Sequence, residues 1–343
     1  MTGRAATADG AAASGAAGSG PPLVSVVVTT RDRHDSLERM LASLARQTYP
    51  RLETIVYDDA SDPPVRGAPG VTLLRRDEPH GACYGRNRCF EKAQGEFVLT
   101  LDDDVELEDP GLIARAVELA ERHPDVAMLM FREVRPDGVY TNTPPGPEGA
   151  ALQITKPGFY GCLIRTGALR RVGMYLVEEF DYCEEEVELA IRLLDAGLRI
   201  VYVPWLSLCH HGDERTRDWR RRFRLTARNT MLTALLRYPL RDLPRGLAGP
   251  VRMFCRRPPV DGRRDWLGLA WIAWHLLAKV PFALRHRAPI RHATLVRHRQ
   301  IFDRPVPVEL APAPGEPRAG PAPGARPPGG PQGGSVATSR AGR

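Results

Sequence analysis

Short apolar, β-branched runs alternate with segments of helical periodicity from residue 22 to residue 212, and this alternation constrains the fold more than any other feature. The runs indicate strands at 23–30, 54–59, 71–76, 97–101 and 126–131. Apolar residues at helical spacing predict helices between them, at 35–47, 84–94 and 112–122. Such alternation is typical of a doubly wound, Rossmann-like α/β domain.

Polar side chains follow three of these strands where each ends, namely Thr29 and Arg31, Asp58 and Asp59, and Asp102, Asp103 and Asp104. Ligands of open α/β sheets bind beyond the carboxyl ends of the strands, so we expect these groups to share one edge. Adjacent carboxylates repel one another, and Mg²⁺ or Mn²⁺ bound to oxygen ligands would offset that repulsion. A solvated acidic turn is the alternative reading of the triplet alone.

Residues 184–204 predict a further helix, ended by Gly197, and then a strand. Four glutamates begin this helix, at Glu184, Glu185, Glu186 and Glu188. Crowded carboxylates raise one another's pKa, as a general base requires, although acidic residues in a first turn also stabilise a helix. His210 and His211 follow the strand; imidazole is a frequent metal ligand, and a histidine by itself is more often structural.

Missing motifs and the spacing of the cysteines argue against several other classes of protein. Residues 81–89, GACYGRNRC, contain neither the GxGxxG fingerprint nor the Walker A pattern, which disfavours a dinucleotide-binding or P-loop enzyme. The six cysteines show no CxxC spacing, and residues 1–20 lack a secretory pattern, so we expect reduced thiols in the cytoplasm. Residues 1–20 and the Pro- and Gly-rich segment 305–343 are predicted to be disordered.

Several motifs occur in one order: SVVVTTRDR, TIVYDDAS, HGACYGRNRCFEKAQGEFVLTLDDDVEL, GCLIRTGALRRVG and YCEEEVELAIRLLDAGLRIVYVPWLSLCHH. Together they resemble family 2 glycosyltransferases over about residues 22–212. The resemblance implies a GT-A fold with a mixed sheet in a catalytic domain at 21–212. It also implies metal-dependent, inverting transfer of a sugar from a nucleotide-diphosphosugar to an acceptor hydroxyl.

The resemblance assigns donor-site roles as well. LDDDV matches the DXD element, so Asp104 would bind Mg²⁺ or Mn²⁺, and Asp102 the ribose or the same metal, with Asp103 beside them. His210 matches a metal-coordinating histidine.

Further residues match positions around the donor nucleotide. Asp58 matches the acidic residue that contacts the base, Thr29 and Arg31 line the nucleotide pocket, and Arg86 and Asn87 match the RN pair beside the donor.

The catalytic base is the remaining implied role. EEVEL matches the family's ED-x-D-L element, which places Glu186 at the base position. Glutamate stands where aspartate is usual, so the base geometry differs and Glu185 is an alternative. TTRDR also replaces the usual PTYNR, which leaves the contacts to a uridine-type base open.

Residues 213–304 form a predicted helical region with strongly basic character. From Arg215 to Gln300 there are 21 Lys and Arg against 4 Asp and Glu. Within it, 266–284 is apolar and just long enough to cross a bilayer. The charge of Lys279 would, however, make insertion of this segment energetically unfavourable. We expect a helix lying on the anionic inner face of the membrane, or one packed on the protein or on a second subunit. The acceptor would then be a glycan or a lipid-linked glycan.

Two other functions fit parts of the chain. A sugar-phosphate nucleotidyltransferase also uses an α/β domain with acidic residues, but it should carry a Gly-rich loop after the first strand, where this chain has VVVTTRDRHD. A nucleic-acid-binding protein would use the Arg-rich region, which shows no RRM, KH or helix-turn-helix signature, so nucleic acid is not an expected partner.

Overall fold

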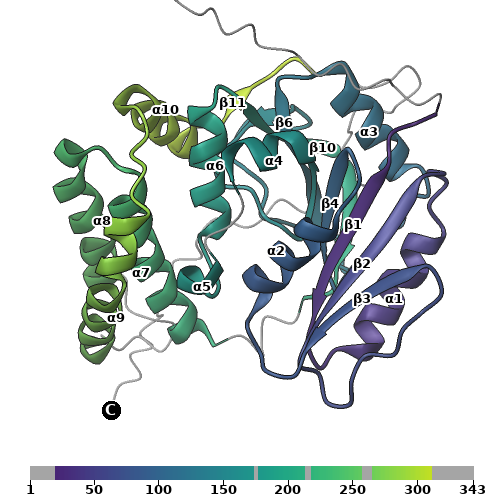
Figure 1. Ribbon diagram of the computed structural model, residues 1–343. Helices are drawn as coiled ribbons and strands as arrows, with labels where there is room; N and C mark the ends of the chain where they lie inside the picture. The colour runs from purple at the N-terminus through teal and green to yellow at the C-terminus, as the bar shows by residue number, and fades with distance from the viewer. Residues whose placement is uncertain (1–19, 174–176, 213–217, 257–264, 311–343) are drawn as a thin grey trace, which may run out of the picture.

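The computed structural model describes residues 20–173, 177–212, 218–256 and 265–310 (Figure 1). Its strands are β1 Val24–Thr30, β2 Leu52–Asp59, β3 Val71–Arg76, β4 Phe97–Asp102, β5 Val105–Glu106, β6 Val126–Val134, β7 Tyr140–Thr141, β8 Leu152–Gln153, β9 Gly161–Arg165, β10 Arg199–His210 and β11 Val306–Pro307. Its α-helices are α1 His34–Ala45, α2 Ala82–Lys92, α3 Leu112–Arg122, α4 Thr166–Val172, α5 Val177–Phe180, α6 Glu185–Asp195, α7 Trp219–Arg237, α8 Leu243–Arg256, α9 Trp266–Arg285 and α10 His292–Asp303.

The strands form a mixed sheet in the order β11-β8-β10-β6-β9-β4-β1-β2-β3. Pairing is parallel among β3, β2, β1 and β4, and again between β6 and β10. β9 lies antiparallel between β4 and β6. The predicted α/β class with a mixed sheet is therefore confirmed, and β9 is the antiparallel strand at its centre.

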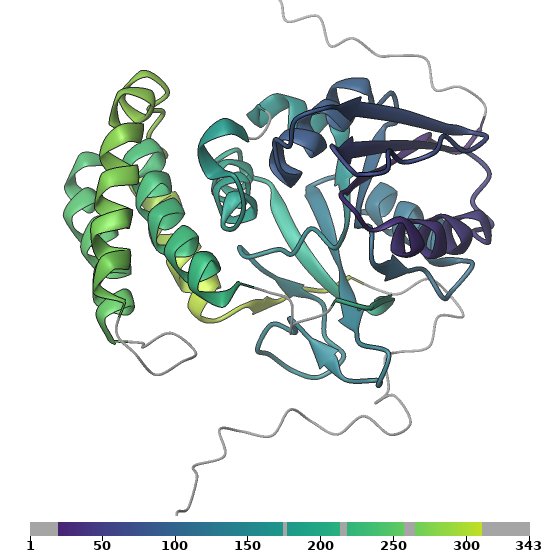
Figure 2. The same ribbon diagram turned by 90° about the horizontal axis from the view of Figure 1, so that it is seen from below.

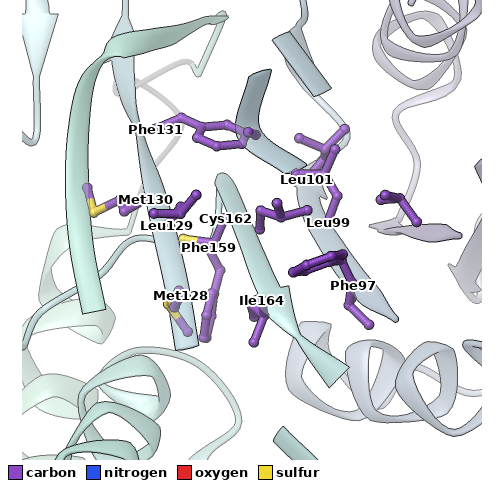
Figure 3. Packing of buried hydrophobic residues seen from close by; sticks show 14 of the residues in the cluster. Phe97, Leu99, Leu101, Met128, Leu129, Met130, Phe131, Phe159, Cys162 and Ile164 are labelled. Carbon is purple, nitrogen blue, oxygen red and sulfur yellow. The ribbon is translucent and has the colours of Figure 1, made fainter. Parts of the chain in front are cut away.

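The centre of the sheet is buried on both faces, as the unbroken apolar runs predict. Leu99 and Leu101 of β4, Phe131 of β6 and Ile164 of β9 are all fully buried. Figure 3 shows side chains of these three strands pointing toward one another. Thr100, the one polar residue inside β4, donates its hydroxyl to the Phe159 carbonyl at 3.1 Å. The buried hydroxyl therefore has a hydrogen-bond partner, and the end of β4 follows a well-packed core.

Strand register sets where the polar strand ends meet. β1 lies between β2 and β4, with Thr29 opposite Asp102 on one side and Thr30 opposite Asp58 on the other. All three strands run in the same direction, so their carboxyl ends reach the same edge. The ends of these strands, where the predicted polar residues lie, therefore meet at one edge of the sheet, as expected.

The basic region is helical, as predicted, and forms a group beside the sheet (Figures 1 and 2). α8 and α9 both pack on α7, and α10 packs on α6. Residues 305–310 were predicted to begin a disordered tail, and this is wrong: Val306–Pro307 pair with β8, and Leu310 is buried. The rest of that tail and residues 1–19 lie outside the described residues.

Candidate active site

A cavity of about 910 Å³ opens at the carboxyl ends of β1 and β4. Its walls come from those two strand ends, the segment 154–160, the start of α6 and the first turns of α7. The cavity therefore lies between the sheet and the basic helical group. Thr29 and Arg31, predicted to line a nucleotide pocket, both line it.

Asp102, Asp104 and His210 come together in this cavity. Each offers one ligand atom, and the three atoms lie within 4.8 Å of one another. His210 reaches the aspartates because the last residues of β10 pair with β5, the short strand that directly follows Asp104 in the chain. Two carboxylates and an imidazole suit Mn²⁺ or Mg²⁺, so the residues present fit the predicted metal.

Glu133, at the end of β6, extends this group and was missed by the sequence analysis. Its carboxylate accepts a hydrogen bond from His210 Nδ1 at 2.5 Å, while His210 Nε2 lies 3.0 Å from Asp104 Oδ1. Burial alone would lower the pKa of His210, but the hydrogen bonds to Asp104 and Glu133 outweigh burial and raise it to about 10. Glu133 thus fixes the orientation of the ring and leaves Nε2 directed at Asp104.

Asp103 is the member of the triplet that turns toward the protein. It accepts from Thr30 Oγ1 at 2.7 Å and from Arg33 Nη1 at 3.0 Å, and the same Arg33 nitrogen lies 2.9 Å from Asp104 Oδ2. Burial raises the pKa of Asp103 to about 6, against the lowering effect of Arg33. Asp103 lines the cavity but is engaged in holding β1 to β4, and Arg33 supplies a cation that the sequence analysis did not identify.

The two aspartates that end β2 have different roles. Asp58, predicted to contact the base, is fully buried, and its carboxylate accepts from the backbone N–H groups of Ser61 and Val65 and from Arg75. These hydrogen bonds lower the pKa of Asp58 against the opposing effect of burial. Asp58 is not among the cavity-lining residues, whereas Asp59 is. The structure therefore brings Asp59, and not Asp58, to the cavity.

Of the predicted Arg86–Asn87 pair, one residue lines the cavity and the other does not. Arg86 lines the cavity, with Nη2 2.7 Å from Asp102 Oδ1 and Nη1 3.8 Å from Glu185 Oε1. Its guanidinium therefore lies between the two acidic groups of the site. Asn87 is buried on α2 and is not among the residues that line the cavity.

The first turn of α6 presents Glu185 and Glu186 to the cavity. Glu185 is buried, and one of its carboxylate oxygens has no hydrogen-bond partner within the described part of the chain. Glu186 is half-buried. Burial raises the pKa of both side chains, and for Glu186 the neighbouring Glu185 raises it further, so both favour the protonated form more than an ordinary glutamate does.

The segment before α6 has an unusual backbone. Asp181, Cys183 and Glu184 all have positive φ, a conformation that costs free energy for residues other than glycine. Two buried residues of α7 hold it. Asn229 Nδ2 lies 2.7–2.9 Å from the carbonyl oxygens of Phe180, Tyr182 and Cys183. Arg228 contacts the Asp181 carboxylate and the carbonyl oxygens of Glu179 and Phe180. This α7 clamp, Arg228 and Asn229, sets where Glu185 and Glu186 point.

Residues 25–175 match the family described as Glycosyl transferase family 2, a stretch that contains Asp102, Asp104 and Arg86 and ends before α6. The O-antigen biosynthesis protein RfbC of Myxococcus xanthus is 28% identical over 228 residues, which are 56% of this chain and 17% of RfbC.

A second relative is the GalNAc(5)-diNAcBac-PP-undecaprenol beta-1,3-glucosyltransferase of Campylobacter jejuni. It is 34% identical over 97 residues, which are 25% of this chain and 31% of that protein. The chain thus spans less than a third of the length of either relative.

Among solved structures, S. aureus TarS 1-349 in complex with UDP-GlcNAc aligns with a TM-score of 0.51 at 15% identity, over 82% of this chain and 92% of the other, and this supports the fold alone. The family match, the relatives and the mixed sheet agree. Residues 25–175 of this chain match glycosyl transferase family 2, and the fold is of the GT-A type.

Proposed function

We propose that this chain transfers a glycosyl group from a nucleotide-diphosphosugar to an acceptor hydroxyl, with inversion and with a divalent cation. The observation that carries the proposal is the shared cavity, in which a metal-type group and a pair of carboxylates face one space. Arg86 connects the two sides, at 2.7 Å from Asp102 and 3.8 Å from Glu185.

The carboxylate side supplies the base. Glu186, with Glu185 as the alternative, takes the proton from the acceptor hydroxyl, and the raised pKa of each strengthens it as a proton acceptor. The acceptor oxygen then forms its bond to the anomeric carbon as the bond to the nucleotide diphosphate breaks. A single displacement of this kind inverts the anomeric centre.

The aspartate side holds the donor. Asp102, Asp104 and His210 would hold Mn²⁺ or Mg²⁺, which when bound neutralises charge on the diphosphate. The guanidinium of Arg86 adds a second positive charge where the leaving group develops negative charge. Glu133 keeps the His210 ring oriented toward Asp104.

The names of the relatives indicate the substrate class. RfbC is named for O-antigen biosynthesis, the Campylobacter protein for an undecaprenol-linked acceptor, and the TarS complex for UDP-GlcNAc. We therefore propose a UDP-, dTDP- or GDP-linked donor and a cell-envelope glycan or lipid-linked glycan as acceptor. The reaction would take place in the cytoplasm, at the inner face of the membrane.

A thermal-shift and sugar-transfer screen tests this function. Wild-type protein is mixed with UDP-, dTDP- and GDP-sugars, with and without Mn²⁺ or Mg²⁺. The true donor should raise Tm more with the metal than without, since ligands that bind the native state stabilise it.

Asp104→Ala should abolish the metal-dependent part of that rise and sugar transfer with it. The matched control is Glu108→Gln, an exposed carboxylate close in the chain that is not among the cavity-lining residues; it should behave as wild type. A near-normal transfer rate in Asp104→Ala would contradict the metal assignment, and no response to any nucleotide-sugar would contradict the function.

A further inference from the structure

The outer side of α9 is apolar from Trp266 to Leu284. Its large exposed residues are Trp266, Leu267, Trp274, Leu277 and Leu284, of which Leu267 is 82% and Trp274 72% exposed. Only alanine and proline lie exposed between them, at positions three or four apart, so they form one helix face. We call these five residues the α9 outer face; it extends about 27 Å along the helix axis at 1.5 Å per residue.

Length and composition alone would let α9 cross a bilayer, with a mean hydropathy of 1.5 and 17% of its apolar window buried. The way its ends are attached argues against a crossing. At its start, the Asp265 carboxylate accepts two hydrogen bonds from Arg224 of α7, at 2.6 and 2.8 Å. After its end, Ala288 N–H donates to the Leu236 carbonyl of α7 at 3.0 Å.

The chain that follows α9 returns to the sheet. α10 packs on α6, and β11 pairs with β8 at the edge of the sheet. A helix whose two ends are both fastened to α7, and whose continuation completes the sheet, cannot place those ends on opposite sides of a membrane. α9 therefore lies along α7, buries Ile272 and Ala283 against the protein, and leaves its outer face uncovered by the described chain (Figures 1 and 2).

Charge indicates what covers this face. The Lys, Arg, Asp and Glu residues of α8 and α9 are all basic, namely Arg245, Arg252, Arg256, Lys279 and Arg285. A second copy of this chain would bring only further cations to this helical group, because neither α8 nor α9 carries an Asp or Glu. An anionic lipid surface pairs them with phosphate, and tryptophan is favoured at the membrane interface.

We propose that the α9 outer face docks the protein flat on an anionic membrane, with its large apolar side chains embedded at the boundary between headgroups and acyl chains. This goes beyond the proposed reaction, because it holds whichever sugar the cavity transfers. α7 places the two features close together. Its residues Arg222 and Thr226 line the cavity, while Phe223 and Ala227 pack with Ile272 of α9.

Vesicle flotation tests the proposal with the full chain. Wild-type protein is mixed with phosphatidylcholine vesicles, with or without about a third of phosphatidylglycerol, at low and high salt. We expect flotation with the anionic vesicles, weaker flotation at high salt, and release by carbonate. Brominated lipids should quench tryptophan fluorescence, since Trp266 and Trp274 lie on the docking face.

Matched variants assign the effect to α9. Trp274→Gln with Leu277→Gln should weaken vesicle binding by about tenfold or more, because two large embedded side chains are lost. Leu240→Gln changes a side chain that is 74% exposed outside α9 and should bind like wild type. Circular dichroism and sugar transfer to a soluble acceptor should be unchanged in both, which separates docking from catalysis.

Three results would overturn the proposal. The first is wild-type protein that stays in solution with anionic vesicles at low salt. The second is equal binding by the α9 double variant. The third is a dimer, measured by light scattering, that the double variant dissociates while vesicle binding is absent, which would make the face a subunit interface.

Discussion

Two kinds of carboxylate share the first turn of α6. Glu185 and Glu186, in the first turn, face the cavity, and Arg86 approaches Glu185 no closer than 3.8 Å. Glu188 is buried and fully paired: its oxygens lie 2.6 Å from Arg192 Nη2 and 2.6 Å from Arg237 Nε. In the sequence EEEVE the three look alike.

The difference shows how one helix combines support with chemistry. Arg192 and Arg237 lower the pKa of Glu188 against the opposing effect of burial, so Glu188 stays charged and joins α6 to α7. The pKa values of Glu185 and Glu186 are raised, which leaves them responsive to a proton donor in the cavity. A pair of arginines is therefore what separates a structural glutamate from a candidate base.

The largest expected effect comes from removing the base. Glu186→Gln should lower the rate of sugar transfer by roughly 10²–10⁴-fold, the usual contribution of a positioned acid or base. Its Tm should hold or rise, because burial and the neighbouring Glu185 make the charged form of Glu186 unfavourable in the folded protein. Initial rates at saturating donor, with Tm measured on the same samples, check both statements.

Glu185→Gln is the matched comparison for that experiment. A full loss of transfer in Glu185→Gln with normal transfer in Glu186→Gln would move the base to Glu185. Normal transfer in both variants would remove this pair from the mechanism altogether.

The next effect is on stability. Glu188→Gln leaves Arg192 and Arg237 buried without their carboxylate, and breaking a buried ion pair in this way costs about 3–5 kcal/mol. Urea unfolding should show that loss, while transfer per folded molecule stays near wild type. A variant that keeps its stability but loses transfer would place Glu188 with the chemistry instead.

A smaller effect is expected at the α7 clamp. Asn229→Ala removes the donor shared by three carbonyls before α6, and leaving buried carbonyls unsatisfied costs about 1–3 kcal/mol. Because the clamp positions Glu185 and Glu186, transfer should fall as well, mainly in kcat. Unchanged kinetics in a stable Asn229→Ala protein would show that the strained segment holds its shape alone.

The smallest effect is on the pH dependence of stability, and its sign differs between the two kinds of carboxylate. Glu188 has a lowered pKa, so its contribution is present above pH 4.5 and is lost as pH falls through its folded pKa. Glu186 has a raised pKa, so the native state binds the extra proton and stability declines as pH rises above 4.5. Tm against pH should therefore lose part of its acid-side fall in Glu188→Gln and part of its decline at higher pH in Glu186→Gln. Parallel curves for the two variants would contradict the assignment.

The strands and helices of the α/β core could be predicted because the apolar residues of each follow the pattern typical of a strand or a helix. The predicted ranges 71–76 and 112–122 coincide with β3 and α3. The strand β9 gave no such signal, since GCLIR is short and pairs with strands far away in the sequence. β11 lies in a Pro- and Gly-rich context and depends entirely on β8 for its hydrogen bonds.

Part of the candidate site could likewise be predicted from the sequence, and part of it could not. The grouping of Asp102, Asp104 and His210 follows from motif order, and the structure brings these residues together. Which of two adjacent aspartates faces the cavity does not follow, because neighbouring strand residues point to opposite faces and only the fold shows that Asp58 is the inward one. Glu133 lies 77 residues from His210 in the chain, a distance at which no local pattern connects them.

The position of α7 has a consequence for which hydroxyl the enzyme can reach. Packed helices lie about 8–10 Å apart, so a bilayer touching α9 and a sugar bound across α7 would be separated by roughly two such spacings. Under the proposed docking, a rigid separation of that kind would select acceptors by their height above the lipid. A sugar attached a few units from its lipid carrier would present its hydroxyl at the level of Glu186, whereas the far end of a long polymer would extend past it.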